Sequence, residues 1–274
     1  MTDPTTNVQD RLELALHLAD AIGAASLREY QSPRLEVTVK DDGSLVTQVD
    51  RDSEARIRQA VGAAFPDDGV LGEEFEETAG GSGWRWVVDP IDGTESFIRG
   101  IPHYCILIGL EYRGEVLGGV ASFPAMGEVL WAARGGGAWW RQRDGEVVRP
   151  RVSSVSAFHE AVIEVGSYRA FEKRGLEEVR NSIMRDARRS RGWSDGYAYA
   201  LVATGRVDGA VQVGLKRWDV SAFIPILREA GGMIGDWGGD GEPYHGFAMA
   251  CAPGVAGPLL ERLAPGAGGG AGSG

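Results

Sequence analysis

The apolar segments between residues 86 and 142 constrain the fold of this 274-residue chain more than any other feature. The stretch "YCILIGLEYRGEVLGGVASFP" predicts two strands joined near "RGE", and "GEVLWAARGGGAWWRQ" predicts a further hairpin. Because strands joined by short turns pair antiparallel, we expect an antiparallel sheet here. Before it, helical spacing predicts a helix over 7–30 and another that begins at Asp50 and is capped by it, with a hairpin around "DDG" over 34–50.

The pattern changes after "VVRPRVSSVS", residues 147–156. Strand-like and helical segments then alternate, which is typical of α/β domains: strand "AVIEVG", helices over 171–184 and 194–204, strand "GAVQV", helix "WDVSAFIPILREAGG" and strand "GFAMAC". We therefore predict a mixed α/β fold with an N-terminal α+β domain over 1–150 and a C-terminal α/β domain over 151–264. The glycine-rich stretch 265–274 is expected to be a disordered tail.

Composition excludes several classes of protein. No window reaches the roughly 18 unbroken apolar residues of a membrane-spanning helix, and the polar start "MTDPTTNVQD" is unlike an export signal, so we expect a soluble protein. Cys105 and Cys251 lie in apolar sequence, which favours reduced thiols and a cytoplasmic location. With 28 basic and 39 acidic residues, the net charge of −11 argues against nucleic acid or an anionic membrane as a partner. This charge also repels an anionic substrate unless bound cations reverse the local field.

The stretch "WVVDPIDGTESFIRG", residues 86–100, places carboxylates at the end of an apolar strand. Such groups are unfavourable there unless they are paired, hydrogen-bonded or bound to metal. Pro90 takes the chain out of the strand ladder, so that Asp89 and Asp92 can turn toward one point. The donors are oxygens, with only His103 nearby, which favours Mg²⁺ or Mn²⁺ over zinc.

The residues "GTES" follow directly and predict an anion site. Gly93 permits close backbone approach and Thr94 supplies a hydroxyl, while the first-turn amides of a helix starting here would attract an anion. Metal ions beside an anion site are typical of phosphate-ester hydrolases.

Each of these residues also has a structural interpretation. The Asp89 and Asp92 pair is compatible with an Asx-type turn or a helix cap. Glu73 taken alone is a solvated acid, Asp219 taken alone is a helix N-cap, and His103 taken alone is structural.

Taken together, the segments "DGSLVTQVD", "LGEE", "WVVDPIDGTESFIRGIP" and "WDVSAFIPILREAGG" resemble the inositol monophosphatase family of metal-dependent, lithium-sensitive phosphatases. The resemblance covers roughly residues 10 to 262 and implies a layered αβαβα sandwich, a homodimer and Mg²⁺ as cofactor, with Mn²⁺ as a substitute. The metal ligands that it implies are Glu73, Asp89, Asp92, Asp219 and the carbonyl group of Ile91.

The resemblance also implies the catalytic groups. Glu73 would hold a metal-bound water, with Thr94 and Asp50 orienting and deprotonating it for in-line attack on phosphorus. The amides of Gly93 and Thr94 would hold the phosphate.

The substrate is predicted from "SRGWSDGYAYALVATGRVD", residues 190–208, which resembles the histidinol-phosphatase branch of this family. Asp195, with Glu95, would pair with the ammonium group of histidinol phosphate, although Asp195 is also placed to cap the helix over 194–204. Inositol enzymes tend to present a glutamate where this chain has Gln212. Arg191 would contact phosphate or stabilise a dimer.

We therefore expect a histidinol-phosphatase of histidine biosynthesis acting on a small phosphorylated substrate. The alternatives are an inositol-1-phosphate phosphatase, a broad-specificity phosphatase of the same family, or a catalytically idle binding module.

Overall fold

The computed structural model describes residues 4–193, 195–238, 241–244 and 246–267. The chain divides into two units. The first comprises the chain up to Arg149 together with Ser221–Ile226, and the second comprises Pro150–Val220 and the chain from Leu227 onward. The division after Arg149 lies next to the boundary expected at 150, but Ser221–Ile226 was expected in the second domain and lies in the first.

The first unit is built on a seven-stranded sheet with the order β3-β4-β5-β6-β7-β8-β9. β3 pairs parallel with β4 and all later neighbours pair antiparallel, which confirms the predicted antiparallel region. The hairpin around "DDG" is also confirmed, as the antiparallel pair β1 (Val37–Val39) and β2 (Leu45–Thr47). The strands of the large sheet are β3 (Gly69–Gly72), β4 (Trp84–Asp92), β5 (Cys105–Tyr112), β6 (Glu115–Phe123), β7 (Glu128–Ala133), β8 (Gly137–Arg141) and β9 (Val147–Val148).

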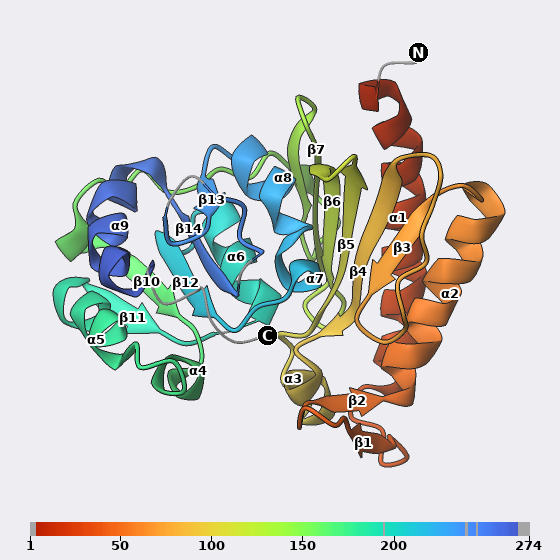
Figure 1. Cartoon of the computed structure of the whole chain (residues 1–274), viewed down its shortest axis with the longest axis horizontal. Helices are drawn as coiled ribbons and strands as arrows, with labels where there is room; N and C mark the ends of the chain where they lie inside the picture. The colour runs from red at the N-terminus through yellow and green to blue at the C-terminus, as the bar shows by residue number, and fades with distance from the viewer. Residues whose placement is uncertain (1–3, 194, 239–240, 245, 268–274) are drawn as a thin grey trace. The chain divides into compact units, whose positions relative to one another are not determined.

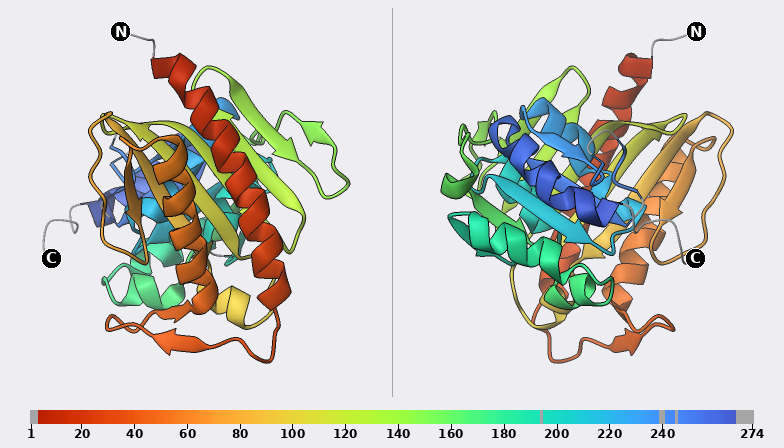
Figure 2. Two further views of the ribbon diagram at one scale, coloured as in Figure 1. Left: turned by 90° about the vertical axis from the view of Figure 1, so that its right-hand side faces the viewer. Right: turned by 60° about the vertical axis from the view of Figure 1, so that its left-hand side comes forward.

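Helices α1 (Pro4–Glu29) and α2 (Gln48–Ala64) lie side by side against one face of this sheet (Figures 1 and 2). Apolar side chains from both helices, such as Ile22 and Ile57, pack in one cluster with Trp86 and Ile108 of the strands. Full burial of an aliphatic side chain contributes about 1.5–3 kcal/mol, so this cluster holds the helices to the sheet.

The opposite face of the same sheet accommodates Ser221–Ile226. Gly109 of β5 and Gly119 of β6 are cross-strand partners, and strand alternation turns them away from the helix-facing Ile108. A Cβ added at Gly109 would lie 2.7 Å from the Ser221 Cβ, and one at Gly119 would lie 2.2 Å from the Ala222 carbonyl oxygen. The glycines therefore let this segment approach the sheet backbone.

Gly119→Ala is accordingly expected to destabilise the protein by about 1–3 kcal/mol, because the added methyl group has no room. Gly62→Ala is the matched control: this glycine lies in α2 with nothing within 4 Å of the added Cβ, so it should stabilise by about 0.4–1 kcal/mol. Denaturant unfolding measures both changes. A Gly119→Ala variant as stable as the wild type would show that Ser221–Ile226 does not pack there.

The second unit contains a five-stranded sheet with the order β11-β10-β12-β14-β13. β10 pairs parallel with β11 and β12, whereas β14 is antiparallel to both of its neighbours. Apolar residues of α4, α5 and α9 pack with Ile163, Val165 and Val211 on one face, and α6 contacts β12 and β14. The elements are β10 (Val162–Val165), α4 (Tyr168–Glu172), α5 (Glu177–Asp186), β11 (Arg189–Arg191), α6 (Asp195–Ala203), β12 (Gly209–Val213), β13 (Met233–Gly235), β14 (Phe247–Cys251) and α9 (Pro253–Ala267).

Two helix predictions were wrong in their extent. The helix expected over 171–184 is divided into α4 and α5, because the left-handed Gly175, with φ of 65°, interrupts it. The helix expected to start near Trp218 is divided into α7 (Arg217–Val220) and α8 (Phe223–Glu229), separated by the residues that meet Gly109 and Gly119. Tertiary packing breaks the second helix where periodicity predicted continuity.

Further elements that were not predicted are β9, β11, β13, α9 and the short 3-10 helix Phe158–Glu160. The helix expected over 194–204 is α6, and Ser194 lies outside the described residues. Of the tail predicted over 265–274, residues 268–274 also lie outside the described residues, and α9 continues to Ala267. In the described part of the chain, none of the helices is both long and apolar enough to span a membrane.

Candidate metal centre

Strand β4 carries Asp89 and Asp92 at its carboxyl end. The register against β5 shifts between these two residues, at Pro90, which lacks an N–H for the ladder. Both acids are buried, with exposed fractions of 2% and 8%. Asp89 Oδ1 also accepts a hydrogen bond of 3.1 Å from the Ile91 amide, as in an Asx-type turn. The turn and the burial of the Asp89 carboxylate are therefore compatible.

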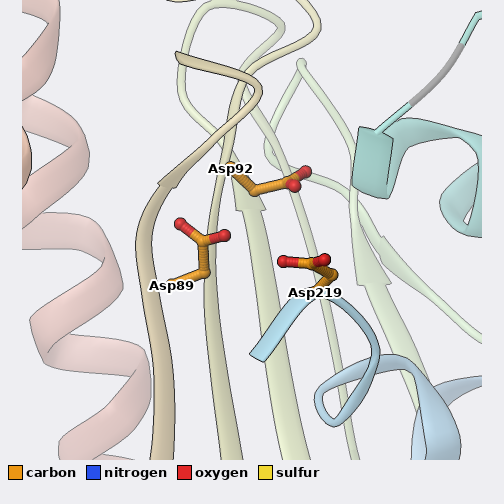
Figure 3. Close-up of side chains that lie close together, drawn as sticks. All are labelled: Asp89, Asp92 and Asp219. Carbon is orange, nitrogen blue, oxygen red and sulfur yellow. The ribbon is translucent and has the colours of Figure 1, made fainter. Parts of the chain in front are cut away.

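Asp219 is the third residue of α7, directly before the segment that packs on β5 and β6. It is not the N-cap: its Oδ2 accepts a hydrogen bond of 2.7 Å from the amide of Lys216, three residues earlier. Asp89, Asp92 and Asp219 each offer an oxygen that lies within 4.8 Å of the others, and their carboxylates point toward one another (Figure 3). We call these three residues the carboxylate cluster.

The carboxylate cluster fits a hard divalent cation. Like charges this close disfavour one another unless a cation lies between them. The donors are all carboxylate oxygens, which suits Mg²⁺ or Mn²⁺ better than zinc. It is the one such group of acidic, histidine or cysteine ligands found within the described residues.

Thr94 and Asp50 form a second group next to the end of β4. Thr94 Oγ1 lies 3.1 Å from the Ile91 carbonyl oxygen and 3.3 Å from Asp50 Oδ1, and its single proton serves one acceptor at a time. Asp50 is 2% exposed, and this burial raises the pKa of its carboxyl group. Hydrogen bonds from Thr47 lower the same pKa, but the effect of burial is larger.

The position of Asp50 corrects the sequence prediction for α2. Thr47, not Asp50, is the N-cap, and Asp50 lies three residues further on, where its carboxylate accepts a 2.9 Å hydrogen bond from the Thr47 amide. This reciprocal capping box fixes the carboxylate that faces Thr94.

Glu73 is outside the carboxylate cluster, and the assignment of this residue to the metal stays a prediction. Lys40 Nζ lies 2.9 Å from Glu73 Oε1 and 2.6 Å from Glu74 Oε1. Burial alone would lower the pKa of Lys40, but the hydrogen bonds to Glu74 and Glu73 outweigh it and raise the pKa, so Lys40 is a firm cation. Lys40 was missed in the sequence because it lies 33 residues before Glu73.

Three further residues that the sequence singled out are Gly93, Glu95 and His103. Gly93 is left-handed, with φ of 78°, a backbone conformation that favours glycine, and it precedes the short helix α3 (Thr94–Ile98). Glu95 is exposed and forms an ion pair with Arg99 one turn later. Burial lowers the pKa of His103, which favours its neutral form.

The remaining predicted substrate residues, Asp195 and Arg191, lie in the second unit and are not members of the carboxylate cluster. Asp195 is the first residue of α6 and has a left-handed backbone, with φ of 55°. Its carbonyl oxygen accepts a 3.1 Å hydrogen bond from Gln212 Nε2. Arg191 ends β11 and lines a pocket with Arg180.

Cys105 is a neighbour of the carboxylate cluster that the sequence did not reveal. Its thiol Sγ lies 3.1 Å from Asp92 Oδ2, on the adjacent strand β5, and can donate to that carboxylate. Cross-strand pairing brings the two residues together, and no local pattern predicts it.

Cys105→Val is expected to weaken divalent-metal binding by about 10-fold or more, because groups that orient a ligand typically contribute 10–100-fold. Cys105→Ser keeps a donor and should stay within a few-fold of wild type. Cys251→Val, at a buried thiol in the apolar cluster of the second unit, is the control. Calorimetric titration with Mn²⁺ measures the affinities, and equal affinities for the two Cys105 variants would contradict the orienting role.

Known proteins are similar to this chain in sequence and fold. The model of the inositol monophosphatase family matches residues 7–266. A histidinol-phosphatase of Chlorobaculum parvum is 40% identical over 241 residues, which cover 88% of this chain and 91% of that protein. An inositol-1-monophosphatase of Rhizobium meliloti is 39% identical over 234 residues, covering 84% of this chain and 86% of the other. The crystal structure of the extragenic suppressor protein suhB of Bartonella henselae superposes with a TM-score of 0.84 at 32% identity, covering 93% and 98% of the two chains.

Proposed function

Because the chain belongs to the inositol monophosphatase family and is therefore a phosphatase, we propose that it hydrolyses L-histidinol phosphate to L-histidinol and phosphate in histidine biosynthesis. The carboxylate cluster is the observation that carries the phosphatase chemistry, since it offers three converging acids to a cation. We assign Mg²⁺ as this cation, with Mn²⁺ as a substitute. We also assign a cytoplasmic location and a homodimeric state.

The cluster residues and the Ile91 carbonyl group would hold the metal, and Glu73 would join them on release from Lys40. A divalent cation in this position polarises the phosphoryl oxygens and makes water a better nucleophile at neutral pH. The amides of Gly93 and Thr94 would bind the phosphate.

Thr94 and Asp50 would move the proton. As the water oxygen forms its bond to phosphorus, a water proton passes to Thr94 Oγ1 and the Thr94 proton passes to Asp50 Oδ1, 3.3 Å away. The ester bond breaks on the opposite side of phosphorus, the leaving alcohol oxygen takes up a proton from solvent water, and Asp50 then returns its proton to solvent.

Asp195 and Gln212 support the choice of substrate. A carboxylate that meets an ammonium group forms a charge-assisted hydrogen bond that neutral polyols cannot form. The Gln212 amide is engaged with the Asp195 carbonyl oxygen, which reduces its capacity to bind inositol hydroxyls. Glu95 has a lesser role in our proposal because Arg99 neutralises it. The Rhizobium relative at 39% identity keeps inositol 1-phosphate as the second candidate substrate.

Asp195→Asn tests the substrate. Asparagine tolerates the left-handed backbone at this position, so the fold should persist. We expect kcat/KM for L-histidinol phosphate to fall about 10–100-fold, corresponding to a charged hydrogen bond of about 1.5–3 kcal/mol, while the value for myo-inositol 1-phosphate changes less than threefold. An equal loss for both esters would assign Asp195 to helix structure instead.

A further inference from the structure

Glu54 is a buried acid to which the proposed mechanism gives no role. It lies in α2, four residues after Asp50, and shares the buried stripe of this helix with Ile57 and Val61, which belong to the apolar cluster against the sheet. Its side chain is fully buried. A carboxylate in such a position is strongly unfavourable unless it is paired and hydrogen-bonded, so its partners indicate what Glu54 does.

The two oxygens of the Glu54 carboxylate have different partners. Oε1 lies 2.7 Å from Nη2 of Arg58, one turn later in α2, and this ion pair compensates the buried charge. Oε2 accepts a 2.7 Å hydrogen bond from the backbone amide of Glu74. Gly72 leaves space for the same carboxylate, because a Cβ added there would lie 2.1 Å from Oε1. Glu54 therefore lies against both neighbours of Glu73 in the chain.

Arg58 extends this contact along the loop over 73–78, which follows β3. Its Nη2 donates to the Phe75 carbonyl oxygen at 3.3 Å, and its Nη1 donates to Thr78 Oγ1 at 2.9 Å. Two backbone hydrogen bonds of 2.9 Å join Thr78 back to β3 and close the loop. The pair formed by Glu54 and Arg58 thus holds this loop at its start, its middle and its end.

We infer that Glu54 is a positioning residue, which fixes the backbone on both sides of Glu73 and leaves the Glu73 side chain able to turn from Lys40 to a metal ion. The inference rests on the role proposed for Glu73 as a metal ligand. The oxygens of Glu54 are engaged by Arg58 and the Glu74 amide, so it acts through Glu73 and not on the metal. A ligand on a loop that is fixed in advance loses less backbone entropy when it binds.

Glu54→Gln tests the inference, because glutamine keeps the size of the side chain but loses its charge for Arg58. We expect calorimetric titration of the full chain, first freed of metal by chelation, to give an affinity for Mn²⁺ about 10-fold or more below that of wild type. Arg58→Met is the second variant, in case Glu54→Gln does not fold. It removes the contacts to Phe75 and Thr78 and should cause a similar loss.

Arg11→Met is the matched control for the loss of a buried ion pair. Arg11 is also a helical arginine, and its Nε lies 2.7 Å from the buried carboxylate of Asp68, which precedes β3, whereas Glu73 follows this strand. The control should lower the stability of the protein but change the affinity for Mn²⁺ by less than about twofold, because groups at well-separated sites act independently.

A double-variant cycle separates positioning from general destabilisation. Glu73→Gln should weaken Mn²⁺ binding by itself, and adding Glu54→Gln should then weaken it by less than about twofold more, because the ligand through which Glu54 acts is already lost. Multiplicative losses would show that Glu54 affects the metal by another route, and the inference would be wrong.

The single variants distinguish two kinds of failure. If Glu73→Gln weakens Mn²⁺ binding but folded Glu54→Gln and Arg58→Met proteins bind Mn²⁺ as wild type does, the inference is overturned and the role of Glu73 stands. If Glu73→Gln itself binds Mn²⁺ as wild type does, Glu73 is not a ligand, and both the inference and that part of the proposed function are wrong.

Discussion

Asp92→Asn is expected to lower kcat for phosphate release about a thousandfold or more while the protein stays folded. The side chain is one of three carboxylates in the cluster, and its neutral amide no longer attracts a divalent cation as strongly. Loss of several kcal/mol of transition-state stabilisation by the metal corresponds to this factor. Steady-state phosphate release measures the loss.

The same variant has a thermal signature that activity alone does not give. Removing one of three crowded negative charges should leave the metal-free protein as stable as wild type or more so, whereas the rise of Tm on adding Mg²⁺ should disappear. Asp20→Asn, at an exposed acid paired with Arg141, is the control and should retain both activity and the Mg²⁺ response. An Asp92→Asn protein that keeps its Mg²⁺ response would contradict the assignment of the cluster to metal.

Thr94 and Asp50 should act as one catalytic unit. Thr94→Val and Asp50→Asn are each expected to lower kcat about 10²–10³-fold, which is the usual contribution of positioned proton transfer. Because both variants interrupt the same proton path, the double variant should be no slower than the slower single one. Thr94→Ser keeps the hydroxyl group and is the control. Independent, multiplicative losses would show that the two residues do not share a proton path.

The pH dependence follows from the burial of Asp50. Burial raises the pKa of this carboxyl group, so Asp50 protonates at a higher pH than an exposed aspartate, for which the pKa is about 3.9. The acidic limb of the kcat profile should lie above that value and vanish in Asp50→Asn. Because the pKa of Asp50 is higher in the folded protein, protonation of Asp50 stabilises the fold. This stabilisation is complete below the pKa that Asp50 has in the unfolded chain, and it is lost as pH rises through the higher pKa in the folded protein.

Local patterns predicted those parts of the fold that local chemistry decides. The hairpin over 34–50 follows from "DDG", and the strands on either side of "RGE" follow from apolar runs bounded by turn residues. Pro90 correctly indicated the break in the β4 ladder. The helix breaks were missed where the cause is distant: close approach of the backbone to Gly119 ends the α-helical run after Val220.

The same division holds for the candidate site. Asp89 and Asp92 are close in sequence, and a family motif added Asp219, so these three were expected together before the fold was known. The roles of Cys105 and Lys40 were not predicted. Cys105 meets Asp92 through a cross-strand contact, and Lys40 pairs with Glu73, 33 residues away, so neither contact leaves a local pattern in the sequence.

The measurement that tests the account most directly is phosphate release by the purified protein with Mg²⁺ and after chelation. It compares L-histidinol phosphate, myo-inositol 1-phosphate and fructose 1,6-bisphosphate at equal concentration. We predict that kcat/KM for L-histidinol phosphate exceeds the other two by at least 10-fold and that the chelated sample is inactive. Equal cleavage of several esters would contradict the substrate, and activity that survives chelation would contradict the metal centre itself.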